Sequence, residues 1–225
     1  MGILKNSTLK RIENNKLLLS AYHLYRTLIG NPEISSSVNH TKKIIFVHNP
    51  KVAGTSLRKL LKLRGDISHL TPGLLVPAKL WEEYFVIVAV REPIERLISS
   101  YNYHTSERYE GFYLKKHPDI KLWTIRKYFD VFSQEPYGII PQVNYLTHPL
   151  SEKRPDFIIR FENLNQDIAG LLDILKIKYT EIPMLNDSRN RVDKPEILLN
   201  KELLTDLIEF YLEDYRMLGY PLPTI

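Results

Sequence analysis

The residues best suited to chemistry lie in one short stretch, residues 46–62, which reads FVHNPKVAGTSLRKLLK. An apolar run ends there, and a lysine and a glycine follow before a segment with helical spacing. Backbone N–H groups at a helix N-terminus carry partial positive charge and bind phosphate or sulfate. Gly54 permits close approach of the backbone, Thr55 and Ser56 add hydroxyl donors, and Lys51 adds a full charge. The pattern predicts an anion-binding loop.

This loop differs from the nucleoside-triphosphate P-loop, which reads GxxxxGK[ST]. Here Lys51 precedes the glycine by three residues, the loop holds one glycine, and Val52 follows the lysine instead of a magnesium-binding Ser or Thr. A P-loop-type kinase is therefore a weaker hypothesis. A strand–loop–helix junction of this kind also occurs without any ligand, so the motif needs support from elsewhere in the chain.

A second motif begins at Arg91, directly after the apolar run 84–90. The planar guanidinium suits phosphate oxygens, although an ion pair with Glu92 or Glu95 is the alternative. Ser99 lies eight residues further on and falls away from the apolar side of the expected helix. That apolar side is formed by Ile94, Leu97, Ile98 and Tyr101.

Strand-like and helix-like segments alternate along the chain. Continuous apolar runs predict buried parallel strands over 43–47, 84–90 and 156–161. Helical spacing predicts helices after Gly54, with Arg58 facing away from the core, then from Pro93, over 163–175, and from Pro195 to Gly219. We therefore expect an α/β, P-loop-like, three-layer fold with a central, mainly parallel sheet and helices on both faces.

Ligands of such sheets bind beyond the carboxyl ends of the strands. Lys51 and Arg91 each follow a strand at that end, so both are expected to face one crevice. Residues 102–150 are rich in aromatic and basic side chains and predict a helical insertion over the active site. The alternative is a solvated helical face with a small core of its own.

Length and composition set outer limits. The chain has 225 residues, a net charge of +5 and no cysteine, which excludes disulfides, thiolate metal sites and a Cys nucleophile. The polar, Ser-rich segment 31–43 predicts a linker. We expect an N-terminal helical extension and linker over 1–42 and one catalytic domain over 43–225. A mildly basic charge favours anionic partners without naming them.

The N-terminal segment 17–30 has the spacing of an amphipathic helix, interrupted by His23 and Arg26. It is too short and too polar for a transmembrane span and has no clean cleavage site for a signal peptide. The sequence therefore predicts a cytoplasmic protein. The helix is expected to pack on the domain, and peripheral membrane or partner contact is the alternative.

Together the two motifs resemble those of the carbohydrate-type sulfotransferases, which use 3′-phosphoadenosine 5′-phosphosulfate (PAPS). HNPKVAGTS, residues 48–56, resembles the 5′-phosphosulfate loop, and VREPIERLISSY, residues 90–101, resembles the 3′-phosphate motif. The sequence is most similar in style to the heparan-sulfate 2-O-sulfotransferase branch and its bacterial relatives. The resemblance covers about 43–220 and includes RFENL (160–164), LNDSRNR (185–191) and YRMLGY (215–220).

The resemblance implies roles for the cofactor-binding residues. Lys51 would contact the oxygen that bridges phosphate and sulfate, and Arg91 with Ser99 would bind the 3′-phosphate. The 5′-phosphate would be wrapped by Ala53, Gly54, Thr55 and Ser56. Arg189 would close over the nucleotide. The usual first loop reads closer to IPKTAGTS, so Val52 replaces a Thr whose hydroxyl would contact phosphate.

A sulfuryl transfer also needs a base for the acceptor hydroxyl, and a neutral His suits this. Among seven histidines, His69 is the first choice because the resemblance puts a catalytic His in its segment. His48 and His104 are the second and third choices. In-line transfer would rest on positioning and charge neutralisation by Lys51 and would need no metal.

The expected acceptor is a hydroxyl-bearing molecule, a sugar in the first instance. His104, Gln142 and Asn144 are candidate acceptor contacts. The basic residues of the insertion favour an anionic acceptor: Arg108, Lys115, Lys116, Lys121, Arg126 and Lys127. A non-catalytic nucleotide- or polyanion-binding module is the main alternative to an enzyme. Nucleic-acid binding would rest on net charge alone and is not expected, and the sequence indicates no oligomeric state.

Overall fold

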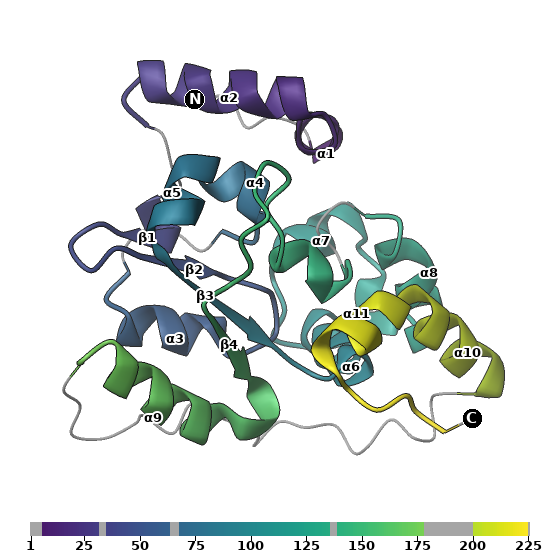
Figure 1. Cartoon of the computed structure of the whole chain (residues 1–225). Helices are drawn as coiled ribbons and strands as arrows, with labels where there is room; N and C mark the ends of the chain where they lie inside the picture. The colour runs from purple at the N-terminus through teal and green to yellow at the C-terminus, as the bar shows by residue number, and fades with distance from the viewer. Residues whose placement is uncertain (1–5, 32–34, 64–67, 136–138, 178–199, 225) are drawn as a thin grey trace. The chain divides into compact units, whose positions relative to one another are not determined.

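The computed structural model describes residues 6–31, 35–63, 68–135, 139–177 and 200–224 (Figure 1). The chain forms two compact units. The first comprises residues 1–90 and 144–185 and contains the β-sheet. The second comprises residues 91–143 and 186–225 and is helical in its described part.

The sheet of the first unit has the strand order β1-β2-β3-β4. Its strands are β1 (Val38–Asn39), β2 (Ile44–Val47), β3 (Phe85–Val90) and β4 (Phe157–Arg160). β2, β3 and β4 pair in parallel, and β1 runs antiparallel to β2. The three predicted strands are confirmed with ends shifted by one residue. β2 and β3 are almost wholly buried, as their apolar runs predict, whereas β4 is partly exposed, with Ile158 37% exposed. The predicted α/β class is confirmed with them.

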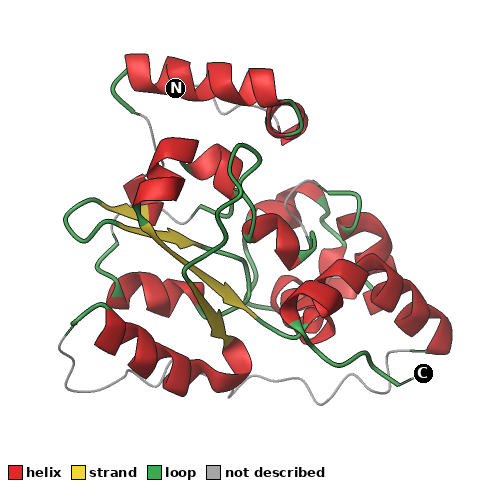
Figure 2. Ribbon diagram, viewed as in Figure 1, coloured by secondary structure: helices red, strands yellow, loops and turns green. Residues whose placement is uncertain are grey.

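Helices cover both faces of this sheet (Figure 2). They are α3 (Gly54–Leu60) and α9 (Leu164–Ile174) on one face, and α4 (Pro72–Leu75) and α5 (Ala78–Glu83) on the other (Figure 1). Side chains alternate along a strand, so Ile44 and Phe46 pack with Leu57 and Leu171 in the core below α3 and α9. Two covered faces hold the strand ends, and the loops that leave them, in fixed positions.

Two helices precede the sheet, α1 (Asn6–Glu13) and α2 (Lys16–Leu28). The side chain of Asn15 caps α2 by accepting the N–H groups of its first turn. On α2, His23 Nε2 donates to the Gly73 carbonyl at 2.5 Å and Arg26 Nη1 to the Leu74 carbonyl at 3.5 Å. The predicted helix over 17–30 is thus confirmed, and it packs on α4.

In the described part of the chain, none of the helices combines the length and the apolar character that a membrane span requires.

Residues 31–43, predicted as a linker, contain regular structure. They hold the 3-10 helix η1 (Ser35–Ser37) and the edge strand β1. Val38 pairs with Ile45, and Ser36 and Ser37 are buried. The prediction of a plain linker is wrong. Two residues of this polar segment, Val38 and Asn39, pair with β2 and so add the short strand β1 to the sheet. The domain boundary at residue 42 stays a prediction.

The second unit is built from helices. Its described elements are α6 (Pro93–Thr105), α7 (Phe112–Lys116), η2 (Ile120–Leu122), α8 (Ile125–Phe132), α10 (Lys201–Phe210) and α11 (Leu212–Leu218). Two further 3-10 helices are η3 (Gln142–Tyr145), which contains the junction of the two units, and η4 (Phe161–Asn163), which belongs to the first unit.

The core of the second unit confirms the predicted helical insertion. Pro93 is the first residue of α6, and the Glu92 side chain caps it by accepting the Glu95 N–H. The stripe Ile94, Leu97 and Ile98 is buried against aromatic residues of α8 and α11. The placement of the insertion over the active site stays a prediction.

The single helix predicted at the C-terminus is wrong in one respect: α10 ends at Phe210 and α11 begins at Leu212. Tyr211 between them has φ −102° and ψ 14°, and its buried hydroxyl donates to the Ile139 carbonyl at 2.8 Å. The apolar spacing runs through this break and therefore hides it. Gly219, at φ 68°, ends α11 as predicted. Pro195 lies outside the described residues.

Candidate active site

The loop between β2 and α3 has an unusual backbone. Lys51 has φ 68° and Ala53 has φ 62°, both in the left-handed region. Such a conformation costs a non-glycine residue about 1–3 kcal/mol and persists only where the surroundings enforce it. Val52 between them is fully buried in the core under α3, and Asn49 donates from Nδ2 to the Ala89 carbonyl at 3.2 Å. These two anchors fix the loop between neighbouring strands.

Gly54 is required by a side chain of its own loop. A Cβ at this position would lie 1.9 Å from His48 Nε2, so the His48 ring occupies the space of the missing methyl group. His48 is 4% exposed. Gly54 therefore allows His48 to pack closely under the start of α3. The prediction from the sequence, that this glycine lets the backbone approach an anion, did not include this packing role.

Next to His48 lies His69, the predicted base. Their ring centroids are 4.7 Å apart in an edge-to-face arrangement, and His69 Nδ1 lies 3.1 Å from the His48 carbonyl oxygen. A carbonyl can only accept, so Nδ1 carries the proton and Nε2 keeps its lone pair. The Tyr145 hydroxyl donates to the His69 carbonyl at 3.3 Å and holds the segment from the other side. His69 is thus oriented, with the ring partly buried and part of the residue open to solvent.

Both histidines are neutral at pH 7. Burial lowers the pKa of His48 to about 3, with His69 and Arg58 lowering it further. Desolvation also lowers the pKa of His69, the hydrogen bond to the His48 carbonyl opposes this, and Arg58 and Lys51 add to the lowering. A neutral imidazole with an available Nε2 can accept a proton.

Arg58 is the residue that the sequence reading misjudged most clearly. The prediction that it faces away from the core is wrong, because its side chain is 5% exposed and its charge acts on both histidines. In a helix, residue 58 lies about 60° from Leu61, at the edge of the apolar face. This position next to the apolar face was the one sign in the sequence that Arg58 could be buried. Its burial places a cation near His48 and His69.

The other predicted residues of the first loop have the exposure that ligand contact requires. Lys51, Ala53 and Ser56 are half-buried, and Thr55 is exposed. The Ser56 N–H donates to the Ala53 carbonyl at 3.1 Å, so it is used within the loop. The side chains of the loop supply two hydroxyls and one ammonium group, a donor set suited to an oxyanion with several oxygens.

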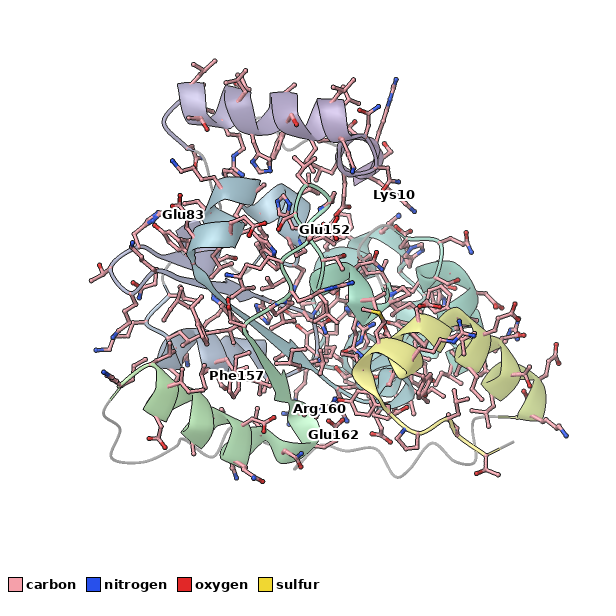
Figure 3. The ribbon with its side chains drawn as sticks, in the orientation of Figure 1. Lys10, Glu83, Glu152, Phe157, Arg160 and Glu162 are labelled. Atoms are coloured by element: carbon pink, nitrogen blue, oxygen red, sulfur yellow. The ribbon has the colours of Figure 1, made fainter. Side chains whose placement is uncertain are left out.

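A third strand ends at the same sheet edge. β4 pairs in parallel with β3, and its last residue, Arg160, is paired with Val90. Figure 3 shows Arg160 and Glu162 at the end of β4 where α9 begins. No role was predicted for Arg160, which is the last residue of the partly exposed strand β4, whereas Arg91 follows the last residue of β3.

In the second unit, Arg91 is held mainly through its backbone. Gln142 is fully buried, and its side-chain amide accepts the Arg91 N–H at 3.0 Å and donates to the Arg91 carbonyl at 2.7 Å. The Arg91 guanidinium pairs with Glu95 at 3.1 Å. The sequence predicts Gln142 as an acceptor contact, but both ends of its amide bind Arg91, so the geometry favours a positioning role.

Asp214 of α11 holds Gln142 in turn. Its carboxylate accepts the backbone N–H groups of Gln142 at 2.8 Å and Val143 at 2.9 Å and is fully buried. Burial raises the pKa of Asp214, while these hydrogen bonds and Arg96 lower it. The chain Asp214–Gln142–Arg91 was invisible in the sequence because its members lie 51 and 72 residues apart.

His104 lies in an aromatic cluster of the second unit. Its ring stacks on Phe132 at 5.3 Å, and Nδ1 lies 2.7 Å from the Tyr128 hydroxyl. Since that hydroxyl donates to Ser100 Oγ at 2.9 Å, Nδ1 of His104 is the donor to the tyrosine oxygen. This arrangement favours a packing role over the predicted acceptor contact.

Three predicted residues remain. Ser99 is half-buried on α6 and Asn144 is exposed in η3. Arg189 lies outside the described residues. Among the described residues, no group of three or more His, Asp or Glu side chains could hold a metal ion.

The strand–loop–helix with its left-handed backbone belongs to an α/β fold, and its donor set makes this loop a candidate anion-binding site. A model of the sulfotransferase family (family 2) matches residues 36–221. The chain belongs to the sulfotransferase family. Searches of curated proteins and of solved structures found no significant match. The match confirms the sulfotransferase family, and the predicted fold class is confirmed, while the carbohydrate type, the use of PAPS, the heparan-sulfate 2-O branch and the bacterial type stay predictions.

Proposed function

We propose that the protein transfers the sulfuryl group of PAPS to a hydroxyl of a carbohydrate acceptor. The observation that carries this proposal is the family match over residues 36–221, which supports sulfuryl transfer in general. The geometry of the two predicted motifs supports the finer assignment. PAPS would act as a co-substrate that supplies the sulfuryl group.

The first loop has the chemistry that a phosphosulfate requires. Lys51 offers an ammonium group from a left-handed position, and Thr55 and Ser56 add hydroxyl donors. Preorganised donors of this kind neutralise negative charge that grows on a leaving phosphate. In a P-loop kinase, the residue after the lysine is a Ser or Thr whose hydroxyl binds magnesium. Here that residue is Val52, which has no hydroxyl and is buried in the core, and this argues against a P-loop-type kinase.

His69 would act as the general base. Its Nδ1–H is committed to the His48 carbonyl, so Nε2 would take the proton of the acceptor hydroxyl. Because the pKa of His69 is lowered, the ring stays neutral at the ordinary His value of about 6.5. Activity is therefore expected to persist as the pH falls through 6.5 and to be lost only at more acidic pH.

Arg91 and Ser99 would bind the 3′-phosphate, which distinguishes PAPS from ATP. Gln142 fixes the Arg91 backbone, and Glu95 pairs with its guanidinium. An incoming phosphate would compete with Glu95, whose side chain is 54% exposed.

The acceptor is proposed to be a sugar, as in the family branch that the motifs resemble. Four of the six basic residues predicted to favour an anionic acceptor have acidic partners. The ion pairs are Lys116–Glu135, Lys121–Glu107, Arg126–Asp206 and Lys127–Asp119. This pairing weakens the argument for a strongly anionic acceptor, so neutral sugars belong in the first screen.

The experiment is transfer of labelled sulfate from PAPS to a panel of neutral and anionic sugars. The unmodified protein is expected to form a sulfate ester. Lys51→Ala and His69→Asn are each expected to lower turnover about 100-fold or more. Exposed residues of the same types serve as matched controls: Lys59→Ala on α3 and His40→Asn. Full turnover by His69→Asn would exclude His69 as the base. Transfer of a phosphoryl group from ATP to the same acceptors, without sulfuryl transfer from PAPS, would contradict the proposal.

A further inference from the structure

The outer side of α2 is apolar, which is unusual for a surface helix. Leu17 is 82% exposed, Leu24 62% and Leu28 77%. Ala21 and Tyr25 between them are exposed as well. Residues 17, 21, 24 and 28 follow the spacing of one helix face, so these side chains form one continuous stripe.

The inner side of α2 carries the polar residues instead. His23 and Arg26 are buried and bind carbonyl groups of α4, and Leu19 is the apolar residue buried beside them. α2 is therefore amphipathic, but its polar side chains face the protein and its apolar side chains face outward, the reverse of the usual arrangement. Packing on the first unit cannot account for the apolar stripe, and a contiguous apolar patch rimmed by polar groups marks a contact surface.

The charges around this stripe indicate its partner. Lys10 and Arg11 of α1 and Lys16 of α2 are exposed, and Figure 3 shows Lys10 on α1. α2 has no acidic residue, and the one acidic residue of α1, Glu13, accepts a hydrogen bond from the Thr71 hydroxyl. An apolar stripe on α2, together with exposed basic residues on α1 and at the start of α2, complements an anionic lipid surface.

The size of the stripe argues against a second copy of the chain as the partner. α2 has 13 residues, hence a length of about 20 Å at 1.5 Å per residue. A stable dimer buries about 800 Å² on each partner, more than one face of so short a helix supplies. The same length is below the roughly 30 Å of a bilayer core, so α2 suits a position in the membrane interface, parallel to its plane.

We propose that the outer face of α2 binds the surface of an anionic membrane. Leu17, Leu24 and Leu28 would enter the boundary between head groups and acyl chains, and Lys10 and Lys16 would contact lipid phosphates. This proposal is independent of the sulfuryl-transfer reaction.

The test is co-sedimentation of the full-length chain with vesicles of phosphatidylcholine, with and without phosphatidylglycerol. We expect binding to the anionic vesicles that weakens as salt rises. The triple variant Leu17→Gln, Leu24→Gln, Leu28→Gln is expected to lose at least about tenfold in binding. The matched control changes three exposed apolar residues elsewhere, Leu122→Gln, Met217→Gln and Leu222→Gln, and should bind like the unmodified protein.

Further outcomes are equally decisive. Lys10→Gln with Lys16→Gln should remove most of the preference for anionic vesicles. Circular dichroism and thermal melting of each variant separate lost binding from lost folding. Absence of vesicle binding by the unmodified protein would overturn the proposal. So would equal binding by the triple variant, or a dimer in sedimentation that the triple variant abolishes while vesicle binding is unchanged.

Discussion

The two anion-binding loops proposed for this protein are held in place by different means. The loop of the first unit depends on backbone conformation, with Lys51 and Ala53 in the left-handed region and the His48 ring packed where Gly54 lacks a Cβ. The loop of the second unit depends on buried hydrogen bonds, with Gln142 bound to both backbone groups of Arg91 and Asp214 bound to Gln142.

This difference has consequences for how each loop fails. The first loop is closely packed around the His48 ring, so an added methyl group would force neighbouring groups out of place. A buried polar chain tolerates no lost partner, because each orphaned group keeps its desolvation penalty. Steric changes should therefore damage the first loop, and nearly isosteric polar changes the second.

At neutral pH, the largest effect of a substitution is expected from Gly54→Ala. The new methyl group would lie 1.9 Å from His48 Nε2, so the ring must leave its site. We expect a loss of about 3 kcal/mol in the free energy of unfolding, at the upper end for overpacking. We also expect loss of binding of adenosine 3′,5′-bisphosphate, the product that PAPS would leave after sulfuryl transfer. Urea denaturation measures the first quantity and calorimetry the second.

The matched control is Gly170→Ala in the interior of α9. Apart from its chain neighbours and the nearby backbone of α9 itself, no atom lies within 4 Å of a Cβ there. The change should therefore stabilise the protein by about 0.5–1 kcal/mol through helix propensity. If Gly54→Ala proved as harmless as this control, the packing of His48 would not be what fixes the first loop.

Gln142→Ala should have the next largest effect. It removes the acceptor of the Arg91 N–H and the donor to the Arg91 carbonyl, at a cost of about 2 kcal/mol in unfolding free energy. We expect affinity for adenosine 3′,5′-bisphosphate to fall about tenfold, since 1.4 kcal/mol corresponds to that factor. Affinity for adenosine 5′-phosphosulfate, which lacks the 3′-phosphate, should be retained.

That selectivity separates positioning of Arg91 from general loss of structure. Equal weakening of both ligands would mean that Gln142 supports the fold and has no specific link to the 3′-phosphate. Gln134→Ala, at an exposed position of the same unit, controls for loss of a glutamine. Asp214→Asn should repeat the pattern of Gln142→Ala in weaker form, because one of its two carboxylate oxygens is kept as an acceptor.

The pH dependence of stability tests the first loop without altering its volume. His48 has a pKa of about 3 in the folded protein and about 6.5 when unfolded. The unfolded chain therefore binds the extra proton first, and stability falls as pH drops from 6.5 toward 3, by up to about 1.4 kcal/mol per pH unit. His48→Gln, which does not titrate and has nearly the volume of His, should make this dependence shallower by one proton in urea denaturation at graded pH. An unchanged slope would contradict the assignment.

The smallest effect is expected from Val52→Thr, which restores the residue usual in the family loop. Because Val52 is fully buried, the hydroxyl would enter an apolar core and cost about 1 kcal/mol of unfolding free energy. Affinity for adenosine 3′,5′-bisphosphate should not rise. A clear gain in affinity, measured by calorimetry, would mean that side chain 52 reaches the ligand.

Sequence alone predicted the elements whose signals are local. The runs IIFV and FVIVAV identify buried strands by composition, and Pro93 and Gly219 mark a helix start and a helix end. The two motifs also indicated the family, because the residue types that an anion requires stand directly after those strands.

The remainder depended on contacts between distant residues. Arg58 is buried because it lies at the edge of an apolar face, where spacing does not decide exposure. The tautomer of His69 follows from a carbonyl 21 residues away, and the role of Gln142 from a backbone 51 residues away. Sequence patterns give no such pairings, so the residues that support the site were missed or misassigned.

One measurement addresses the central claim most directly: calorimetric titration of the protein with adenosine 3′,5′-bisphosphate without magnesium, and with ATP plus magnesium. We predict tight bisphosphate binding that Lys51→Ala and Arg91→Ala each weaken and that the exposed-site controls Lys59→Ala and Arg216→Ala leave unchanged. Preference for magnesium–ATP, or bisphosphate binding that is indifferent to both Lys51 and Arg91, would contradict the claim.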